Sequence, residues 1–445
     1  MLSTMNTVEL SEYGRRSTVP SAVARMMSAF ASGFRDGVDI NLGVGYVNEA
    51  TIPTAQVLEA TAEVLAAPER FRQPLNYGGP TGSLPLKDAI RRYWLDNAVG
   101  GVSETHLAGR RIIIGLSGAT SLLYAVAGVM DPGIVVTGDP MYYIYTNVLR
   151  RRGFEILAIP EDDEGPRADL LEAELERLGE RAAGVRYIYL VTISNPTGTI
   201  CTTARKAAWI DAARRLSERL GRRVPVILDR AYEDLIHDPD VAPPASGLTL
   251  DGDGLVYEVS TLSKIVAPGL RIGYMIGPDT PLLRAIVQTC SDMGFSASPA
   301  LQSVAASMLD RHVTEQIQAV NAGYRRRAQQ VGAAIDELLG DVLEHRTGGQ
   351  AGFYYYLTFR DVETHDRSPL LRFLSRTTGD DAVDGPADDP KPRVVTIPGE
   401  ICVDPGGRLV EVGKRQMRLS YGYEDPRRVV EGLRLIREGV AYARG

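Results

Sequence analysis

The sequence predicts an α/β fold in which a mostly parallel sheet of seven strands, one of them antiparallel, is covered by helices on both faces. Continuous apolar runs of five to seven residues recur through the middle of the 445-residue chain and alternate with helical segments. This alternation is typical of βαβ units. Only nine residues separate the last two runs, from Thr261 to Arg271, which is too short for a crossover helix, so these two strands should be antiparallel neighbours.

Most of the seven runs are continuously apolar rather than alternating, as expected for strands that are covered on both faces. In chain order they are Arg111–Gly115, Gly133–Asp139, Glu155–Pro160, Tyr187–Ile193, Val224–Asp229, Leu255–Thr261 and Arg271–Gly277. The helices expected between the first five are Ser121–Met130, Tyr142–Arg152, Asp169–Ala182 and Thr203–Leu220.

A second, smaller α+β unit is expected from both ends of the chain. Residues 1–50 form an arm and part of this unit, residues 51–310 form the large domain, and residues 311–445 complete the small one. The expected elements are a helix over His312–Leu339, strands over Gly352–Phe359, Arg393–Ile397 and Gln416–Tyr421, and a final helix over Asp425–Ala443. The acidic stretch Gly379–Pro392 is rich in Pro and Gly and indicates a solvated loop or a disordered insertion.

The composition argues against several classes of function. The formal net charge of −7 does not favour a nucleic-acid surface. The three cysteines and five histidines are widely spaced, so neither a disulfide framework nor a metal site is expected. There is no basic-then-apolar leader and no run of 18 apolar residues, so we expect a cytoplasmic protein that does not enter a membrane.

Chemically useful residues follow the strands, and in an open α/β sheet ligands bind beyond the carboxyl ends of the strands. The small residues Ser117–Thr120 open a helix, whose N-terminus suits a phosphate, although such a turn is equally often a simple cap. Asp229 ends an apolar strand, where its carboxylate needs a positive partner. Lys264 follows the next strand, and Arg271 returns along the hairpin to the same edge. These groups should converge on one cleft, where burial or a nearby cation lowers the pKa of a lysine nucleophile.

Other residues at these strand ends allow two interpretations each. Tyr142 could stack on a flat ring or pack in the core. Asn195 could be a turn residue or a donor to a ligand. Gly45 and Tyr46 could line a substrate pocket, as could the aromatic run Phe353–Tyr356, which suits a strand core at least as well.

These segments together resemble the class I and II aminotransferases, which are pyridoxal-phosphate enzymes of fold type I, and are nearest the aminoadipate/kynurenine aminotransferase subgroup. The resemblance spans nearly the whole chain, and its motifs are specific in combination although none is alone. The motifs are "STLSKIVAPGLRIGYMIG" (Ser260–Gly277), "SNPTG" (Ser194–Gly198), "DRAYEDL" (Asp229–Leu235), "NYGGPTGSLPLKDAI" (Asn76–Ile90) and "MRLSYG" (Met417–Gly422). The chain departs from the family in having Thr261 where Ser is frequent, and in lacking the Gln common in the phosphate turn.

The resemblance implies a role for each matching residue. Lys264 would form a Schiff base with the cofactor and shuttle the substrate proton, and Asp229 would pair with the ring nitrogen. Asn195 and Tyr232 would donate to the ring oxygen, and Tyr142 would stack on the ring. The phosphate would be held by Ala119, Thr120, Thr261, Ser263 and Arg271, together with Tyr77 of the other subunit of a homodimer. Arg418 would bind the substrate α-carboxylate, a bidentate role that suits a guanidinium, with Asn195, Gly45 and Tyr46 nearby.

The resemblance thus implies a homodimeric aminotransferase that moves an amino group from an α-amino acid to a 2-oxo acid by a ping-pong mechanism. Another pyridoxal-phosphate reaction, such as β-elimination, cyclisation or oxidation, would use the same core residues. Structural interpretations also exist: a surface lysine for Lys264, a packing residue for Tyr77 and an ion pair for Arg418. A regulator that senses the cofactor is a different class of function, but the first 50 residues are short and unlike a winged helix.

Overall fold

The computed structural model describes residues 8–21, 24–25, 28 and 33–445 of the chain. Its larger sheet has the strand order β2-β9-β8-β7-β6-β3-β4-β5. The strands are β2 (Arg110–Ile114), β3 (Ile134–Asp139), β4 (Glu155–Asp162), β5 (Gly165–Pro166), β6 (Val185–Val191), β7 (Val226–Asp229), β8 (Val256–Thr261) and β9 (Gly273–Pro278). The central β4-β3-β6-β7-β8 ladders are parallel, and β9 runs antiparallel to both β8 and β2, which confirms the predicted hairpin.

The sheet has an eighth strand that the sequence did not predict. The two residues of β5 turn back after Asp162 and pair antiparallel with the end of β4. Gly165 has a φ of +103°, a conformation that glycine adopts without steric cost. A strand of two residues carries no periodicity, so the predicted number of seven was one short.

Helices cover both faces of this sheet. One hydrophobic cluster joins it to α6 (Gly118–Val129), α7 (Tyr143–Arg151) and α11 (Pro281–Asp292). The other buries side chains of α3 (Thr54–Ala66), α4 (Leu84–Asp96), α8 (Leu171–Leu178), α9 (Thr203–Leu220), α10 (Gly247–Leu250) and α12 (Pro299–Arg311). The limits of α9 agree with the prediction because Thr202 caps its first turn and Gly221, with φ 63°, ends it. The helix expected over Asp169–Ala182 is shorter, since Gly179 breaks it after Leu178.

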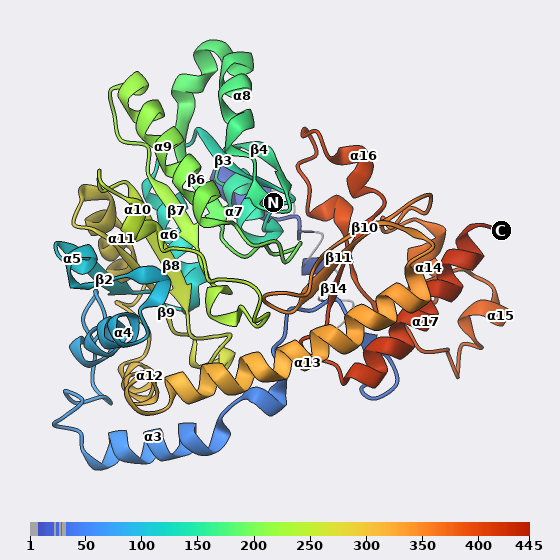
Figure 1. Cartoon of the computed structure of the whole chain (residues 1–445), viewed down its shortest axis with the longest axis horizontal. Coiled ribbons are helices and arrows are strands. Elements are labelled where there is room, and N and C mark those ends of the chain that lie inside the picture. The colour runs from blue at the N-terminus through green and yellow to red at the C-terminus, as the bar shows by residue number, and fades with distance from the viewer. Residues whose placement is uncertain (1–7, 22–23, 26–27, 29–32) are drawn as a thin grey trace, which may run out of the picture.

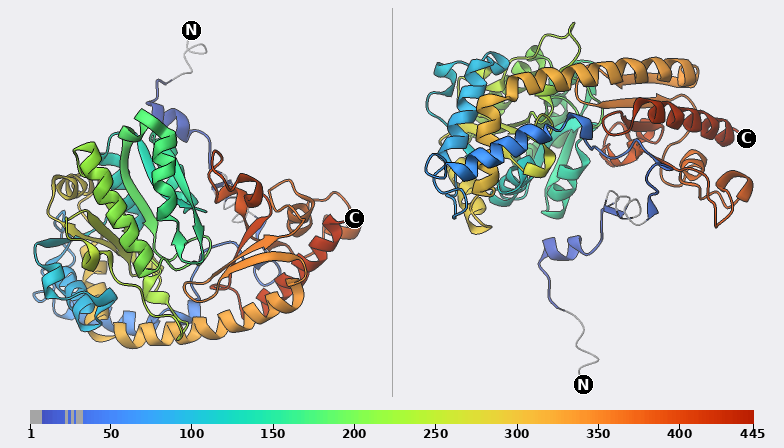
Figure 2. Two further views of the ribbon diagram at one scale, coloured as in Figure 1. Left: turned by 45° about the horizontal axis from the view of Figure 1, so that its top comes forward. Right: turned by 90° about the horizontal axis from the view of Figure 1, so that it is seen from below.

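A smaller antiparallel sheet has the order β10-β11-β14-β13. Its strands are β10 (Leu343–Gly348), β11 (Tyr354–Phe359), β13 (Ile397–Pro398) and β14 (Gln416–Ser420). The helix α13 (Val313–Leu339) runs beneath both sheets and links them (Figure 1). The last helix, α17 (Pro426–Ala443), packs beside α13 (Figure 2). The predicted domain limits at residues 50/51 and 310/311 stay predictions.

One expectation for the C-terminal part needs correction, and one choice between alternatives can be made. The single strand expected over Arg393–Ile397 is two short strands: β12 (Val394–Val395) pairs parallel with β1 (Ile40–Asn41), whereas β13 joins the smaller sheet. The acidic stretch Gly379–Pro392 is a mostly exposed loop, the first of the two alternatives predicted for it. It contains the one-turn helix α15 (Asp381–Asp384), whose last carboxylate accepts hydrogen bonds from Thr378 and Gly379.

The remaining short helices lie at the periphery of the two sheets. They are α1 (Glu12–Ser17), α5 (Glu104–Leu107), α14 (Pro369–Ser375) and α16 (Val410–Gly413). Within the described ranges, the structure has no helix of the length and apolar character needed to cross a bilayer.

Candidate functional site

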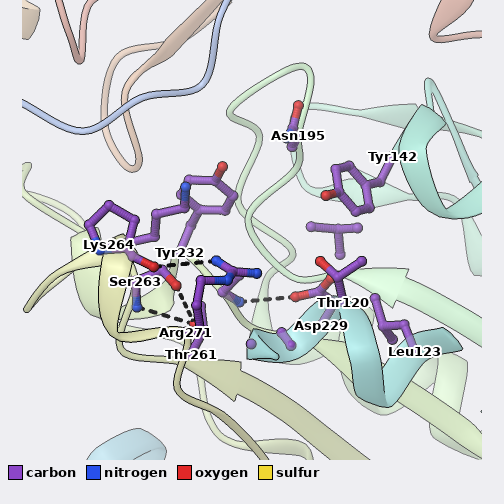
Figure 3. Close-up of a pocket in the computed structure, with 15 residues that line it drawn as sticks. Thr120, Leu123, Tyr142, Asn195, Asp229, Tyr232, Thr261, Ser263, Lys264 and Arg271 are labelled. Carbon is purple, nitrogen blue, oxygen red and sulfur yellow. Dashed lines mark hydrogen bonds between the residues drawn. The ribbon is translucent and has the colours of Figure 1, made fainter. Parts of the chain in front are cut away.

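A cavity of about 220 Å³ lies beyond the carboxyl ends of β6, β7 and β8 (Figure 3). Ten of the eleven predicted cofactor residues line it: Ala119, Thr120, Tyr142, Asn195, Asp229, Tyr232, Thr261, Ser263, Lys264 and Arg271. The parallel strands bring the first residues after each strand to a common edge, as the order of the sheet requires. The cavity is therefore assembled from segments more than 150 residues apart in the sequence, from Ala119 to Arg271.

Lys264 enters this cavity from the turn after β8. Its Nζ donates a hydrogen bond to the carbonyl oxygen of Gly45 at 3.4 Å and lies 5.4 Å from the ring centroids of both Tyr232 and Phe353. Burial, followed by the positive charges of Arg418 and Arg271, lowers the pKa of this amine to about 8. The amine is therefore far more easily deprotonated than an ordinary lysine, as a nucleophile or a proton carrier must be.

Asp229 faces the same cavity from the end of β7. Its Oδ2 accepts a hydrogen bond from the Tyr189 hydroxyl at 2.9 Å, and its Oδ1 accepts one from the Ala231 N–H at 3.2 Å. Burial raises the pKa of the carboxyl to about 6, although both donors and the Lys264 charge favour the ionised form. A carboxylate held in this way suits a cationic group of a ligand that enters the cavity.

The first turn of α6 and the β8–β9 hairpin form a cradle for an anion. Gly118, with φ +66°, lets the chain turn sharply into the helix, and the Arg271 guanidinium packs against it. A Cβ at Gly273 would collide with the backbone of Gly118 and Ala119, so only glycine lets the two segments approach this closely. Arg271 donates to the carbonyl oxygen of Ser117 at 3.2 Å, which holds it at the positive end of the helix.

Two hydroxyls complete the cradle. Thr261 Oγ1 and Ser263 Oγ lie 2.8 Å apart, and the Ser263 N–H donates to Thr261 Oγ1 at 3.1 Å. Free helix N–H groups, hydroxyls and a guanidinium are the donors that a phosphate group needs. A ring stacked beside Tyr142, with a nitrogen at Asp229 and a carbonyl at Lys264, would place its phosphate here. The residues present therefore fit pyridoxal phosphate.

Arg418 reaches the site from β14 in the smaller sheet. It is 2% exposed, donates to Asn195 Oδ1 at 2.6 Å and to the Gly43 carbonyl oxygen, and lies 4.3 Å from the ring centroid of Tyr354. Its Nε has no hydrogen-bond partner within the described part of the chain. A buried donor without a partner is costly, so the guanidinium has capacity for a carboxylate.

Four predicted residues do not line the cavity: Arg418, which contacts it through Asn195, and Gly45, Tyr46 and Tyr77. Gly45 reaches it through its carbonyl oxygen, whereas Tyr46 is 49% exposed and packs edge-on against Tyr423. Tyr77 is not among the residues that line the cavity of its own chain. It is 90% exposed and packs edge-on against Phe295 in a separate recess.

Two further side chains touch the site, of which Tyr189 was not predicted and Tyr354 was left open. Tyr189 holds Asp229, and strand periodicity could have found it, since it shares a face of β6 with Val191, which pairs with Asp229. Tyr354, within the aromatic run left open above, shares a hydrogen bond with Tyr232 at an oxygen–oxygen distance of 2.9 Å. Nothing in the run distinguishes Tyr354 from its aromatic neighbours, and all four residues of the run are buried.

One cluster elsewhere has the residue types of a metal site. Potential ligand atoms of His365, Asp366 and Glu400 lie within 4.8 Å of one another, but the two carboxylates are exposed and His365 already pairs with Glu363. The expectation that the chain has no metal site stays a prediction.

Comparisons with known proteins agree with this geometry. The family model "Aminotransferase class I and II" matches residues 38–372. The chain is 26% identical over 411 residues to aromatic-amino-acid aminotransferase 1 of Thermococcus litoralis, covering 90% of this chain and 88% of that one. It superposes on a kynurenine aminotransferase of Pyrococcus horikoshii, solved in complex with PMP, with a TM-score of 0.81 at 22% identity, covering 99% and 98% of the two chains.

Another relative is named as a transcriptional regulator rather than as an aminotransferase. The chain is 25% identical over 352 residues to the uncharacterized HTH-type transcriptional regulator YisV of Bacillus subtilis. The match covers 78% of this chain but only 63% of the length of that regulator.

Proposed function

We propose that this chain, which belongs to the class I and II aminotransferase family, is a pyridoxal-phosphate enzyme that transfers an amino group from an α-amino acid to a 2-oxo acid. The observation that carries the proposal is that the Lys264 amine and the Asp229 carboxylate line one cavity with an anion cradle, and that the Arg418 guanidinium contacts Asn195 at the edge of this cavity. A ping-pong cycle follows from having one such cavity, which the amino acid and the oxo acid occupy in turn.

Each group has a proposed role in holding the cofactor. Ala119, Thr120, Thr261, Ser263 and Arg271 bind its phosphate, and Tyr142 stacks on its ring. Asn195 and Tyr232 donate to the ring oxygen, and Asp229 keeps a proton on the ring nitrogen. When bound, the cofactor supplies an electron sink that makes the bonds to the substrate α-carbon labile.

The substrate is handled by residues from both sheets. The Arg418 guanidinium binds the α-carboxylate, helped by the Asn195 side chain that it already contacts at 2.6 Å. This fixes the α-carbon so that Lys264 Nζ can take the α-proton and return it elsewhere. Because burial and the two arginines lower the pKa of Lys264, the free amine is an effective base near neutral pH. Gly45, whose carbonyl oxygen accepts a hydrogen bond from Lys264, and the adjacent Tyr46 are proposed to contact the substrate.

We also propose a homodimer in which Tyr77 reaches the phosphate of the other subunit. Leu75 and Tyr77 are 79% and 90% exposed, and Phe295 and Met293 are exposed beside them. Large apolar side chains gathered on one surface are characteristic of an interface. A dimer in solution that Tyr77→Ala and Leu75→Glu weaken would support this proposal, and a monomeric wild-type chain would contradict it. We propose a cytoplasmic location, since Cys201, Cys290 and Cys402 are free thiols.

The absorption spectrum of the purified protein, reconstituted with pyridoxal phosphate, tests the proposal. We expect a visible band from the lysine-bound cofactor that is lost in Lys264→Ala and retained in Lys414→Ala, a control at an exposed lysine paired with Glu411. A panel of amino acids should then convert the cofactor to pyridoxamine phosphate. Absence of the band after reconstitution would contradict every enzymatic proposal made here.

The same panel of amino acids distinguishes the aminotransferase from the alternative functions. Release of ammonia or of an oxidised product would favour elimination or oxidation on the same scaffold. The match to YisV favours one further candidate, a sensor of the cofactor or of an amino acid within a regulator. Cofactor binding without turnover of any amino acid would support the sensor and overturn the aminotransferase.

A further inference from the structure

The strand β6 carries two buried tyrosines on the face that packs against α6 and α7. Tyr187 and Tyr189 are two residues apart, so their side chains project from the same side of the sheet. Both are fully buried. The Tyr187 hydroxyl bonds to the Tyr145 hydroxyl at 2.6 Å, whereas the Tyr189 hydroxyl donates to Asp229 Oδ2 at 2.9 Å. Only the second of these two bonds reaches the candidate site.

The bond from Tyr189 constrains Asp229 in both orientation and charge. With the Ala231 N–H on Oδ1 and the Tyr189 hydroxyl on Oδ2, each carboxylate oxygen is held by one donor, which fixes the plane of the group. Burial and the Asp229 charge raise the pKa of Tyr189 well above its usual value, so the phenol stays protonated and acts as a donor. A donor to a buried carboxylate stabilises its ionised form.

We propose that Tyr189 is a positioning residue for Asp229, whose carboxylate it keeps ionised and directed at the ring nitrogen of the bound cofactor. The proposal rests on the proposed function, because it requires pyridoxal phosphate in the cavity. The proton between the ring nitrogen and Asp229 goes to the more basic partner. By making the carboxylate less basic, the Tyr189 hydroxyl keeps this proton on the nitrogen, where it strengthens the electron sink.

The neighbouring tyrosine provides a matched control. Tyr187→Phe and Tyr189→Phe each remove one buried hydroxyl and one hydrogen bond from the same face of the same strand. If Tyr189 had only a structural role, the two variants would behave alike. The Tyr189 ring also packs edge-on against the Tyr145 ring at 4.7 Å between centroids, and phenylalanine at position 189 preserves that contact.

The direct measurement is the ¹⁵N chemical shift of the ring nitrogen in ¹⁵N-labelled pyridoxal phosphate bound to each holoenzyme at neutral pH. In Tyr189→Phe we expect the resonance to move toward the value of an unprotonated pyridine, and kcat to fall about tenfold with KM unchanged, the size of one hydrogen bond to a charged group. Tyr187→Phe should keep the wild-type shift and kcat while losing similar thermal stability.

A second variant tests the opposite direction without removing the side chain. Placing 3-fluorotyrosine at position 189 makes the phenol a stronger donor, so the resonance should move toward the protonated value. If the shift stays at the wild-type value in both Tyr189 variants, the inference is wrong and Tyr189 is only a packing residue. That result is distinct from failure of the proposed function, in which wild-type protein would bind no cofactor through Lys264.

Discussion

Removing one buried charge should destabilise the segment that follows Asp229 at the end of β7 and carries Tyr232. Lys206 is 0% exposed, and its Nζ donates to Glu233 Oε1 at 2.5 Å and to the Ala245 carbonyl oxygen at 3.0 Å. Glu233 also accepts from Arg230 at 2.7 Å. Although burial raises the pKa of Glu233, the charges of Arg230 and Lys206 hold it at about 2, so the carboxylate is ionised in the folded chain.

Lys206→Met removes one of the two cations that compensate this carboxylate. Breaking a buried ion pair from one side costs about 3–5 kcal/mol of unfolding free energy, and we expect about 3 kcal/mol because Arg230 remains. Since residues 230 and 233 follow Asp229 and Tyr232 directly, the variant should also bind pyridoxal phosphate more weakly. The double variant Lys206→Met/Glu233→Gln should lose less than the sum of the two single variants, because it leaves no uncompensated charge.

Urea unfolding followed by tryptophan fluorescence reports on this region. Both tryptophans of the chain are fully buried beside the ion network: Trp209 lies one turn along α9 from Lys206, and the Trp94 ring lies 4.4 Å from the Arg230 guanidinium. Lys414→Met, which breaks the exposed pair with Glu411, should leave the urea midpoint unchanged. An unfolding midpoint for Lys206→Met equal to that of the wild type would refute the argument.

Three further predictions concern the site itself. Because burial and two arginines lower the pKa of Lys264 to about 8, the free amine becomes abundant as the pH rises through 8. The rate at which the apoprotein captures pyridoxal phosphate, followed by absorbance, should therefore rise with a midpoint near pH 8. A midpoint near pH 10.5 would contradict this. Gly273→Ala pushes a methyl group into the first turn of α6, so it should weaken cofactor binding at least about tenfold and lower the unfolding free energy by about 1–3 kcal/mol. The control Gly269→Ala, in the same hairpin, places its methyl group in open space and should bind the cofactor normally. Arg418→Lys should raise KM for the amino acid about 10- to 100-fold without changing the spectrum of the bound cofactor, since lysine cannot reproduce a bidentate contact. An unchanged KM would mean that the substrate carboxylate binds elsewhere.

The parts of the molecule that could be predicted are those with repeated local signals. The long strands, the antiparallel hairpin at Thr261–Arg271 and the helix Thr203–Leu220 follow from apolar runs, spacing and capping residues. The cavity could be predicted because the first residues after parallel strands must meet at one edge of the sheet. Family resemblance added the roles, which composition and spacing alone do not supply.

The parts that could not be predicted depend on contacts between distant segments. The strands β1, β5, β12 and β13 have two residues each and exist only through their partners, so no periodicity marks them. Tyr189 and Tyr354 reach the site by side-chain hydrogen bonds to Asp229 and Tyr232. The alternation of β6 places Tyr189 on the same face as Asp229, but nothing local separates Tyr354 from buried core tyrosines. The placement of Tyr77 relative to a second subunit lies outside what one chain contains.

The pairing of β1 with β12 cannot form until nearly the whole chain has been synthesised. Ile40 pairs with Val394, which is 354 positions later in the chain, and the carbonyl oxygens of Gly43 and Gly45, just after β1, contact Arg418 and Lys264. A ribosome adds roughly 5–20 residues per second, so roughly 20–70 s pass between synthesis of the two strands. During this interval Ile40 and Leu42, fully buried in the finished protein, lack the strand with which they pair. Arg418 lies on β14, so a chain that stops before this strand cannot form the complete site.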